Sequence, residues 1–569
     1  MMKNTFRKVN NEKGVALIFS FLILIILLGL SSMFILRAVH ESNLAKKELN
    51  LAKSFYISEA GTQKGLDELD NLINNYMYTT INEANPSYVV SLTDSHYTSN
   101  QVLEFLKAAV LNGGSPVLTV SSQQITHDCS DADFGAGSFS CNIILTPSVN
   151  APEKIGADTW NFFYNYQMQA TGNSGGSTKP LKVNGDFTVT VQRENFAKYA
   201  LFTNTQTTSS GSNVWFTNKT NFAGPLHTNG TYNFYGNPSG TFEDVVDQVS
   251  QTARFYNSGF PVLLDDDNNG IKDVPIFNNG FNRAVASISL SSSVEQQDMV
   301  DQATGGNTYS SDGIYIPVSG SNLTGGVYVK GDANVTLEVD ASNNPKYTVV
   351  QGGTTKKITL DKTNNQTSVD VNGTVTTYTG LPDGVDNVGT LLYVDGNINN
   401  FSGTVQEGEA VTVASTSDII INNHIYYTDY TAAVGTPGTA GYVPPHADGA
   451  SNLLGIVSWA GNVRIGTSAP NDINIHGTVL SKDKVFTVDN YSSGSPRGTA
   501  TLLGGAVTNN YGAFGTFNGS TGLQVSGYGR NFVYDQRMQT GNGPPYFPSL
   551  NTFQAVTNDI TDKMIFQDG

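Results

Sequence analysis

The stretch VALIFSFLILIILLGLSSMFIL, residues 15–36, decides the organisation of this chain because it holds 22 residues without a charge. A helix of this length reaches roughly 33 Å at about 1.5 Å per residue, enough to cross the hydrocarbon core of a bilayer. The preceding residues 1–14 are basic, with Lys3, Arg7, Lys8 and Lys13 against Glu12. Because basic flanks stay in the cytoplasm, the sequence predicts one membrane-inserted helix with an extracytoplasmic body.

The apolar run continues into an amphipathic segment, whereas a secretory signal would end at a small-residue cleavage site. Between residues 37 and 75, apolar side chains recur at helical spacing: Leu44, Leu49, Ala52, Phe55, Ala60, Leu66, Leu69 and Leu72. No proline interrupts residues 15–75. We therefore expect one helix over 15–75, about 60 residues long, half in the membrane and half projecting as a stalk.

Three features of this N-terminus match a known pattern. A short basic leader ends in Lys13-Gly14, the uncharged run opens Val15-Ala16-Leu17, and a Ser-Glu-Ala-Gly box occupies residues 58–61. Together they resemble the type IV pilin-like N-terminus, particularly minor pilins of the PilX kind and the large tip pseudopilin of type II secretion. The alternative interpretation is a signal-anchor helix that is neither cut nor assembled.

The resemblance implies a specific processing route and set of partners. A prepilin peptidase would cut after Gly14, leaving a leader of residues 1–14, and methylate the new amine of Val15. Other pilins or pseudopilins would contact the helix once it leaves the inner membrane. Major pilins carry a glutamate at mature position 5, where this chain has Phe19. That departure suits a minor or tip component of a type IV pilus or related secretion filament, acting in assembly, adhesion or surface contact.

Composition supports an extracytoplasmic β-rich body. The 569 residues include 31 basic and 48 acidic side chains, giving a net charge of −17, and 58 glycines. Nucleic acid is excluded as an expected partner because no cluster of Lys and Arg is available to neutralise phosphates. Low charge with abundant Thr, Val and Tyr is typical of strands.

Strand patterns divide the body into two parts. Residues 76–193 contain alternating runs such as FTVTV at 187–191, which predict a small α+β head with an antiparallel sheet packed on the stalk. Residues 194–569 show short apolar runs between Gly and Asn turns. Such repeats favour a right-handed parallel β-helix, with a β-sandwich as the alternative. The tail GNGPPYFPSLNTF, residues 541–553, is expected to wrap the surface without regular structure.

A second resemblance covers this β-rich part. The sequences FAKYALFTNT (196–205), GPLHTNG (224–230), GGVYVKGD (325–332) and GYGRNFVYDQRM (527–538) are similar to an uncharacterised domain that often follows the PilX-like stem. This resemblance implies a location and carries no catalytic assignment.

Two local motifs predict stabilising bonds. In LLDDDNNGIKDVP, five residues occupy positions 1, 3, 5, 7 and 9 of a calcium loop: Asp265, Asp267, Asn269, Ile271 and Asp273. Ile276 stands where an EF-hand has its bidentate glutamate, so we expect structural calcium in a shorter loop, or else a solvated acidic turn. Cys129 and Cys141 lie 12 positions apart and are expected to form a disulfide if the body is exported, or else to remain free thiols.

Enzymatic activity is not expected, although a membrane-anchored β-helix adhesin or glycan-active enzyme remains the alternative function. Acid pairs on one face of a β-helix could act on glycans, for which the candidates are Asp332, Asp395, Asp418 and Asp483. We expect His227 and His476 to be structural. An aromatic platform for a surface glycan or host surface could use Trp215, Trp459, Tyr232, Phe234, Tyr235, Tyr426 and Tyr427, which are otherwise core residues.

Overall fold

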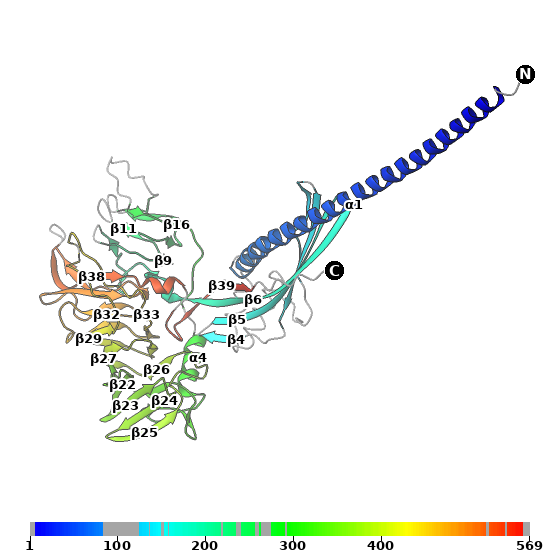
Figure 1. Ribbon diagram of the computed structural model, residues 1–569. Helices are drawn as coiled ribbons and strands as arrows, with labels where there is room; N and C mark the ends of the chain where they lie inside the picture. The colour runs from blue at the N-terminus through cyan, green and yellow to red at the C-terminus, as the bar shows by residue number, and fades with distance from the viewer. Residues whose placement is uncertain are drawn as a thin grey trace, which may run out of the picture.

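A computed structural model shows one long helix followed by a mostly β body (Figure 1). The structure describes residues 6–82, 125–135, 137–148, 153–156, 159–217, 220–234, 240–255, 261–262, 275–290, 293–437, 439–518, 523–540 and 543–561. The calcium-type loop 265–273 predicted from the sequence lies outside the described residues.

Helix α1 (Phe6–Asn82) is continuous over 77 residues, so the single helix expected from the sequence is confirmed and is longer than predicted. Its first half projects away from the rest of the molecule (Figure 1). The segment Gly14–Asp70 contains an apolar window that is long enough to cross a bilayer and that no other part of the described chain covers. This apolar surface needs either lipid or other helices around it.

The stalk half of α1 packs on the head sheet, which is antiparallel as predicted. Its strands follow the order β1-β3-β5-β6-β39, with β2 and β4 as short additions. Their bounds are β1 (Ile125–Asp128), β2 (Asp131–Phe134), β3 (Gly137–Pro147), β4 (Glu153–Gly156), β5 (Thr159–Ser174), β6 (Ser177–Asn195) and β39 (Ser549–Thr561). Ile57 and Leu69 of α1 are buried with Met168 and Leu181 of the sheet, which forms the core of the head.

Strand β39 joins the head although it comes from the end of the chain. It runs antiparallel to β6, with Ala555 opposite Val191. The expectation that residues 541–553 lack regular structure is therefore wrong from Ser549 onward, because the edge of β6 offers main-chain partners. The β-rich part between β6 and β39, residues 196–548, is called the body from here on. The chain enters it after Asn195 and leaves it before Ser549, and these two residues lie opposite each other.

The first body sheet contains 11 strands in the order β16-β12-β9-β7-β36-β33-β30-β28-β26-β20-β17. All neighbours are parallel except β17 with β20. Their bounds are β7 (Leu201–Thr205), β9 (Leu226–Thr228), β12 (Val246–Gln248), β16 (Phe281–Arg283), β17 (Gly313–Tyr315), β20 (Val327–Lys330), β26 (Thr390–Asp395), β28 (Ala410–Ser415), β30 (Leu453–Ser458), β33 (Thr478–Ser481) and β36 (Ala506–Asn510).

The second body sheet has 15 strands, of which the central ones are parallel. They are β18 (Val318–Ser319), β19 (Asn322–Leu323), β21 (Ala333–Val339), β22 (Pro345–Gln351), β23 (Thr354–Asp361), β24 (Gln366–Val371), β25 (Thr374–Thr379), β27 (Ile398–Val405), β29 (Ile419–Tyr427), β31 (Val463–Ile465), β32 (Asn474–His476), β34 (Phe486–Val488), β35 (Pro496–Leu503), β37 (Gly515–Phe517) and β38 (Gln524–Val533).

From β26 to β36 the chain alternates between the two body sheets, one strand or pair at a time. This path has the strand connectivity that a parallel β-helix requires. Side chains at equivalent positions stack in buried columns, one of which runs Val327, Leu392, Val413, Ile456, Val479, Ala506 and Leu201. We call one pass of the chain through both sheets a coil; side chains of both sheets share one buried core, and each column residue also lies against its counterparts in the neighbouring coils.

The order of stacking departs from the order of the sequence. The first strand of the body, β7, lies in the middle of the 11-stranded sheet, and the next coils stack from it toward β16 at one end. The chain then crosses through α4 (Ser293–Thr304) to β17 at the other end. The remaining coils return until β36 pairs with β7. Smaller sheets beside the first coils contain β8 (Trp215–Phe216), β10 (Asn233–Phe234), β11 (Thr241–Phe242), β13 (Ala253–Phe255), β14 (Pro261–Val262) and β15 (Ile276–Phe277), and short helices η1 (Phe196–Lys198) and η2 (Gln536–Thr540) flank the body.

Candidate functional site

The candidate functional site is helix α1, with its exposed apolar half and the contact surface, here called the seat, by which residues 58–61 pack on the head sheet. Gly14 and Val15, the residues of the expected cleavage junction, lie within α1, and the Val15 side chain is 54% exposed. Phe19, where the expected pilin pattern would have a glutamate, is 62% exposed. A phenylalanine at this position has no carboxylate with which to form an ion pair, and its ring favours lipid or apolar side chains as neighbours.

The Ser-Glu-Ala-Gly box seats the stalk on the head sheet. Ser58 is buried and its hydroxyl donates a 2.9 Å hydrogen bond to the carbonyl oxygen of Ala170 in β5. A Cβ on Gly61 would lie 2.8 Å from the ring of Phe139, so only glycine permits this approach. Glu59 faces solvent on the other side of the helix. The box therefore has two residues that fit the head and one carboxylate left on the outer face.

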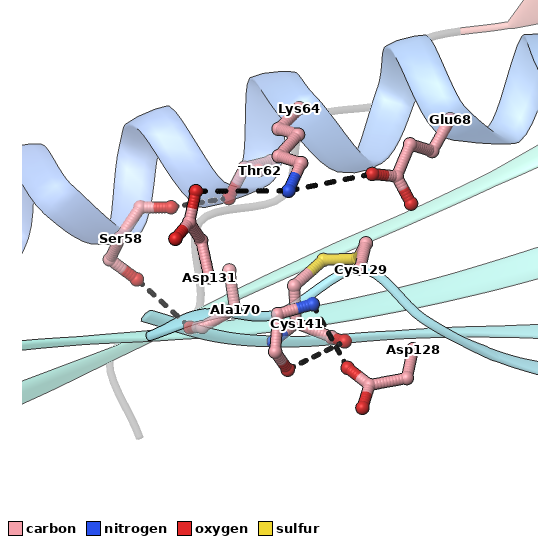
Figure 2. Close-up of a disulfide and its surroundings, with 10 residues drawn as sticks. Ser58, Thr62, Lys64, Glu68, Asp128, Cys129, Asp131, Cys141 and Ala170 are labelled. Atoms are coloured by element: carbon pink, nitrogen blue, oxygen red, sulfur yellow. Dashed lines mark hydrogen bonds and ion pairs between the residues drawn. A yellow bond between two sulfur atoms is a disulfide. The ribbon is translucent and has the colours of Figure 1, made fainter. Parts of the chain in front are cut away.

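A disulfide lies directly beneath this seat (Figure 2). Cys129 and Cys141, the pair expected from the sequence, are joined with their Cα atoms 4.8 Å apart, and both are buried. A Cβ built on Gly65 of α1 would lie 3.0 Å from Sγ of Cys141. The bond thus closes the β2–β3 hairpin against the helix.

Lys64 connects the helix to the disulfide hairpin (Figure 2). Its ammonium lies 3.6 Å from the carboxylate of Glu68 and 3.9 Å from that of Asp131 in β2. It also lies 5.6 Å from the ring centre of Phe139. No sequence pattern points to Lys64, because its partner Asp131 is brought near only by the fold of the hairpin.

The candidate glycan-active acids hold the turns between coils together. Asp332 accepts hydrogen bonds from the main-chain and side-chain nitrogens of Asn397, and the main-chain bond lowers the pKa of its carboxyl group. Asp418 likewise accepts from Asn462, and Asn397 in turn accepts from the main-chain N–H of Asp418. These bonds form a ladder from coil to coil and give both carboxylates a structural role.

The other two candidate acids are also engaged. Asp395 pairs with Lys330 at 3.2 Å and accepts hydrogen bonds from Tyr328 and Thr416. Asp483 lies 2.8 Å from the ammonium of its neighbour Lys482. The geometry of these four acids gives no support to an acid pair acting on a glycan.

His227 and His476 lie inside the stacked columns. The ring of His227 stacks on Phe202 of the adjoining coil, with centres 5.1 Å apart. Nδ1 of His476 accepts a hydrogen bond from the main-chain N–H of Tyr427. Burial, with a smaller contribution from the nearby His424, lowers the pKa of His476 to about 3, so that its ring stays neutral near pH 7. This agrees with the structural role expected for both.

Most of the candidate aromatic platform is core. Trp459, Tyr232, Phe234 and Tyr427 are buried, whereas Trp215 and Tyr426 are half-buried. Tyr426 stacks between His424 and Tyr430 with ring centres 5.1 and 5.7 Å away. Tyr235 and the five calcium-loop residues lie outside the described part of the chain. Within that described part, no group of three or more His, Cys, Asp or Glu side chains could hold a metal ion.

One buried acid cluster had no sequence signal. Glu409 is buried, accepts a 2.5 Å hydrogen bond from the hydroxyl of Tyr347, and pairs with Lys362. Burial, together with the charge of Glu409, raises the pKa of Asp383 to about 6. The contacts of Glu409 with Tyr347 and Lys362 join the β22–β24 hairpins to the start of β28, since the three residues come from these separate segments.

Comparison with known proteins yields one family match. Residues 161–247 match a family described as a domain of unknown function (DUF4900). The match begins in β5 of the head and ends in the first coils of the body, so it covers the β6–β7 junction through which the chain enters the body. No curated protein and no solved structure matches the chain. The chain thus pairs an apolar N-terminal helix with a β-rich part in which residues 161–247 match this family.

Proposed function

We propose that this chain is a minor, tip-type pilin-like component of a type IV pilus or a related secretion filament. Its role is structural: residues 15–36 leave the inner membrane to join an apolar bundle of sister helices, and the body extends from the filament for adhesion or surface contact. The body is a β-helix in this proposal, carried extracytoplasmically by the stalk.

The observation that carries the proposal is the continuity of α1. One unbroken helix has an exposed apolar half, and its other half is seated on a small antiparallel sheet through Ser58 and Gly61. A simple membrane anchor has no need for a rigid connection between span and head. A subunit that must move from the membrane into a filament needs that rigid connection, because the helix has to carry the head with it.

The test is intact mass and N-terminal sequencing of the protein taken from the cell envelope. The proposal expects a chain that begins at Val15, with or without a methyl group on its amine. A matched pair of variants, Gly14→Val and Gly29→Val, separates processing from helix effects, since a Cβ at either glycine meets nothing within 4 Å.

The Gly14→Val chain should retain its leader and be absent from filaments. The Gly29→Val chain should be cut normally. A wild-type chain that still begins at Met1 would contradict the proposal. It would favour the second candidate, an adhesin held in the membrane by an uncut helix.

A further inference from the structure

Strand β25 lies at the tip of a set of hairpins that interrupts the coils between β20 and β26. Strands β21 to β25 pair antiparallel in sequence order. The last hairpin turns at Asn372 and Gly373, which both have positive φ (52° and 90°), as two-residue hairpin turns require. Figure 1 places β25 at the end of the body opposite β11 and β16.

One edge of β25 is open. The strand pairs with β24 along all of Thr374–Thr379, but on its other side β19 reaches only Thr379, whose N–H donates to the carbonyl of Ser321. Because main-chain groups alternate in direction along a strand, those of Val375 and Thr377 also point to this open side. Among the described residues, no strand pairs with 374–378 there.

This edge lacks the protection that exposed edges usually have. Proteins shield edge strands with charges, prolines, bulges or short length. The sequence TVTTYT contains no charge and no proline, and Val375 is 61% exposed. Strands at the ends of the described body sheets are only two or three residues long, as in β14, β16, β17, β18 and β37.

We propose that β25 is a self-association edge, at which two copies of this chain join by antiparallel pairing of β25 with β25. The alternation of main-chain groups requires residues 375 and 377 to pair with 375 or 377 of the other copy, and centring the pair on Thr376 uses the whole open stretch 374–378. Val375 of one copy forms a hydrogen-bonded pair with Thr377 of the other, which places Thr376 opposite Thr376 in a non-hydrogen-bonded pair. Thr374 then faces Tyr378, a pairing of β-branched and aromatic side chains that stabilises sheets.

A second copy is the occupant because the edge is complementary to itself. An isologous two-fold contact pairs the strand with an identical strand, so any net charge on it would be repeated in its partner and would repel at short range. TVTTYT has none. The contact is small and weak for a single pair, and several copies held near one another would add their contacts. It would join bodies at the ends remote from the membrane helix, whether or not α1 enters a filament.

The register can be tested by a cysteine at the two-fold centre. Thr376→Cys in the full-length chain on the cell envelope should give disulfide-linked dimers under mild oxidation, since facing Cα atoms at such a pair lie about 4.5 Å apart. Thr374→Cys is the matched control, because its two copies would lie roughly 14 Å apart along the strands. The chain's own cysteines, Cys129 and Cys141, are already bonded to each other.

A second variant tests the main-chain bonds. Thr377→Pro removes an N–H that points away from β24, so the hairpins keep their bonds while the edge loses a donor. Combined with Thr376→Cys, Thr377→Pro should reduce the yield of disulfide-linked dimer at least tenfold. The proposal is overturned if Thr376→Cys gives no dimer, if Thr374→Cys links equally well, or if Thr377→Pro leaves linking unchanged. Cross-linking of Thr376→Cys only to a different protein would overturn the choice of a second copy.

Discussion

The side-chain amides of Asn204 and Asn509 are joined by a 2.9 Å hydrogen bond although they lie 305 residues apart in the sequence. Asn204 belongs to β7, the first strand of the body, and Asn509 belongs to β36 in its last coil. The contact exists because β36 stacks on β7. The coils from β7 to β16 and the coils from β20 to β36 are thereby held in one continuous sheet. Its two end strands, β16 and β17, both come from the middle of the chain.

A cavity at this junction should weaken both sets of coils together. Val507 of β36 is buried opposite Phe202 of β7, and Val507→Ala is expected to lower the free energy of unfolding by about 2 kcal/mol. Val525→Ala, at a side chain 52% exposed, should change it by less than about 0.5 kcal/mol. Denaturant unfolding followed by tryptophan fluorescence and circular dichroism measures both. Separate transitions for the two sets of coils, with only one affected, would contradict their coupling through β36 and β7.

The close approach of α1 to the head predicts that Gly61 cannot be enlarged. Gly61→Val would force the ring of Phe139 to move, because even the Cβ lies 2.8 Å from it, and should destabilise the head by about 1–3 kcal/mol. Gly29→Val is the control on the same helix, since nothing lies within 4 Å of its Cβ. Thermal unfolding in detergent compares the two, and equal midpoints would show that α1 is not tightly seated at Gly61.

The disulfide should stabilise the hairpin that closes on α1. Replacing both Cys129 and Cys141 with serine is expected to cost about 2–3 kcal/mol, mainly through the greater freedom of the unfolded loop. Ser140→Ala, at an exposed neighbour, serves as the control. Limited proteolysis should cut the double variant sooner within residues 125–141. Unchanged resistance to proteolysis would mean that the Lys64–Asp131 contact and the sheet hold the hairpin in place without the disulfide.

The buried His476 predicts a loss of stability at acid pH. Its folded pKa of about 3 lies below the ordinary value of 6.5, so the unfolded chain binds a proton that the folded chain does not. The His476 contribution is therefore fully present above pH 6.5 and is lost as pH falls toward 3, by up to about 1.4 kcal/mol per pH unit.

His476→Gln should flatten the dependence of the unfolding free energy on pH between 6.5 and 4. His40→Gln, at an exposed site on α1, is the matched control. Urea unfolding at several pH values makes the comparison. Identical slopes for wild type and His476→Gln would contradict the prediction.

A charge in the apolar span should impair membrane insertion. Leu27 lies near the middle of residues 15–36, where an arginine costs about 2.5–3.5 kcal/mol on the insertion scale. Leu49 lies on the stalk with the same 55% exposure, so Leu49→Arg is a matched control. Carbonate extraction of membranes should release Leu27→Arg and retain Leu49→Arg. Release of both to the same extent would place the membrane boundary further along the helix.

Much of the secondary structure follows from local sequence patterns. The run of 22 uncharged residues and the helical spacing of Leu44 to Leu72 predict one helix, because helical hydrogen bonds join residues four apart and need no distant partner. Alternation in FTVTV predicts a half-buried strand of the head for a similar reason. The Ser58 and Gly61 positions stand out in the sequence as a box, but their contacts with Ala170 and Phe139 emerge only from packing.

The sequence by itself determined the long apolar helix, the strand-rich body and the turns at Gly and Asn, since each depends on interactions between near neighbours. Only the tertiary structure decided that β39 returns to β6, that β36 stacks on β7 and that Lys64 meets Asp131. Such pairings depend on which surfaces remain open after the other coils have stacked. Many short strands of similar composition could compete for the same edge, so no local pattern identifies the partner.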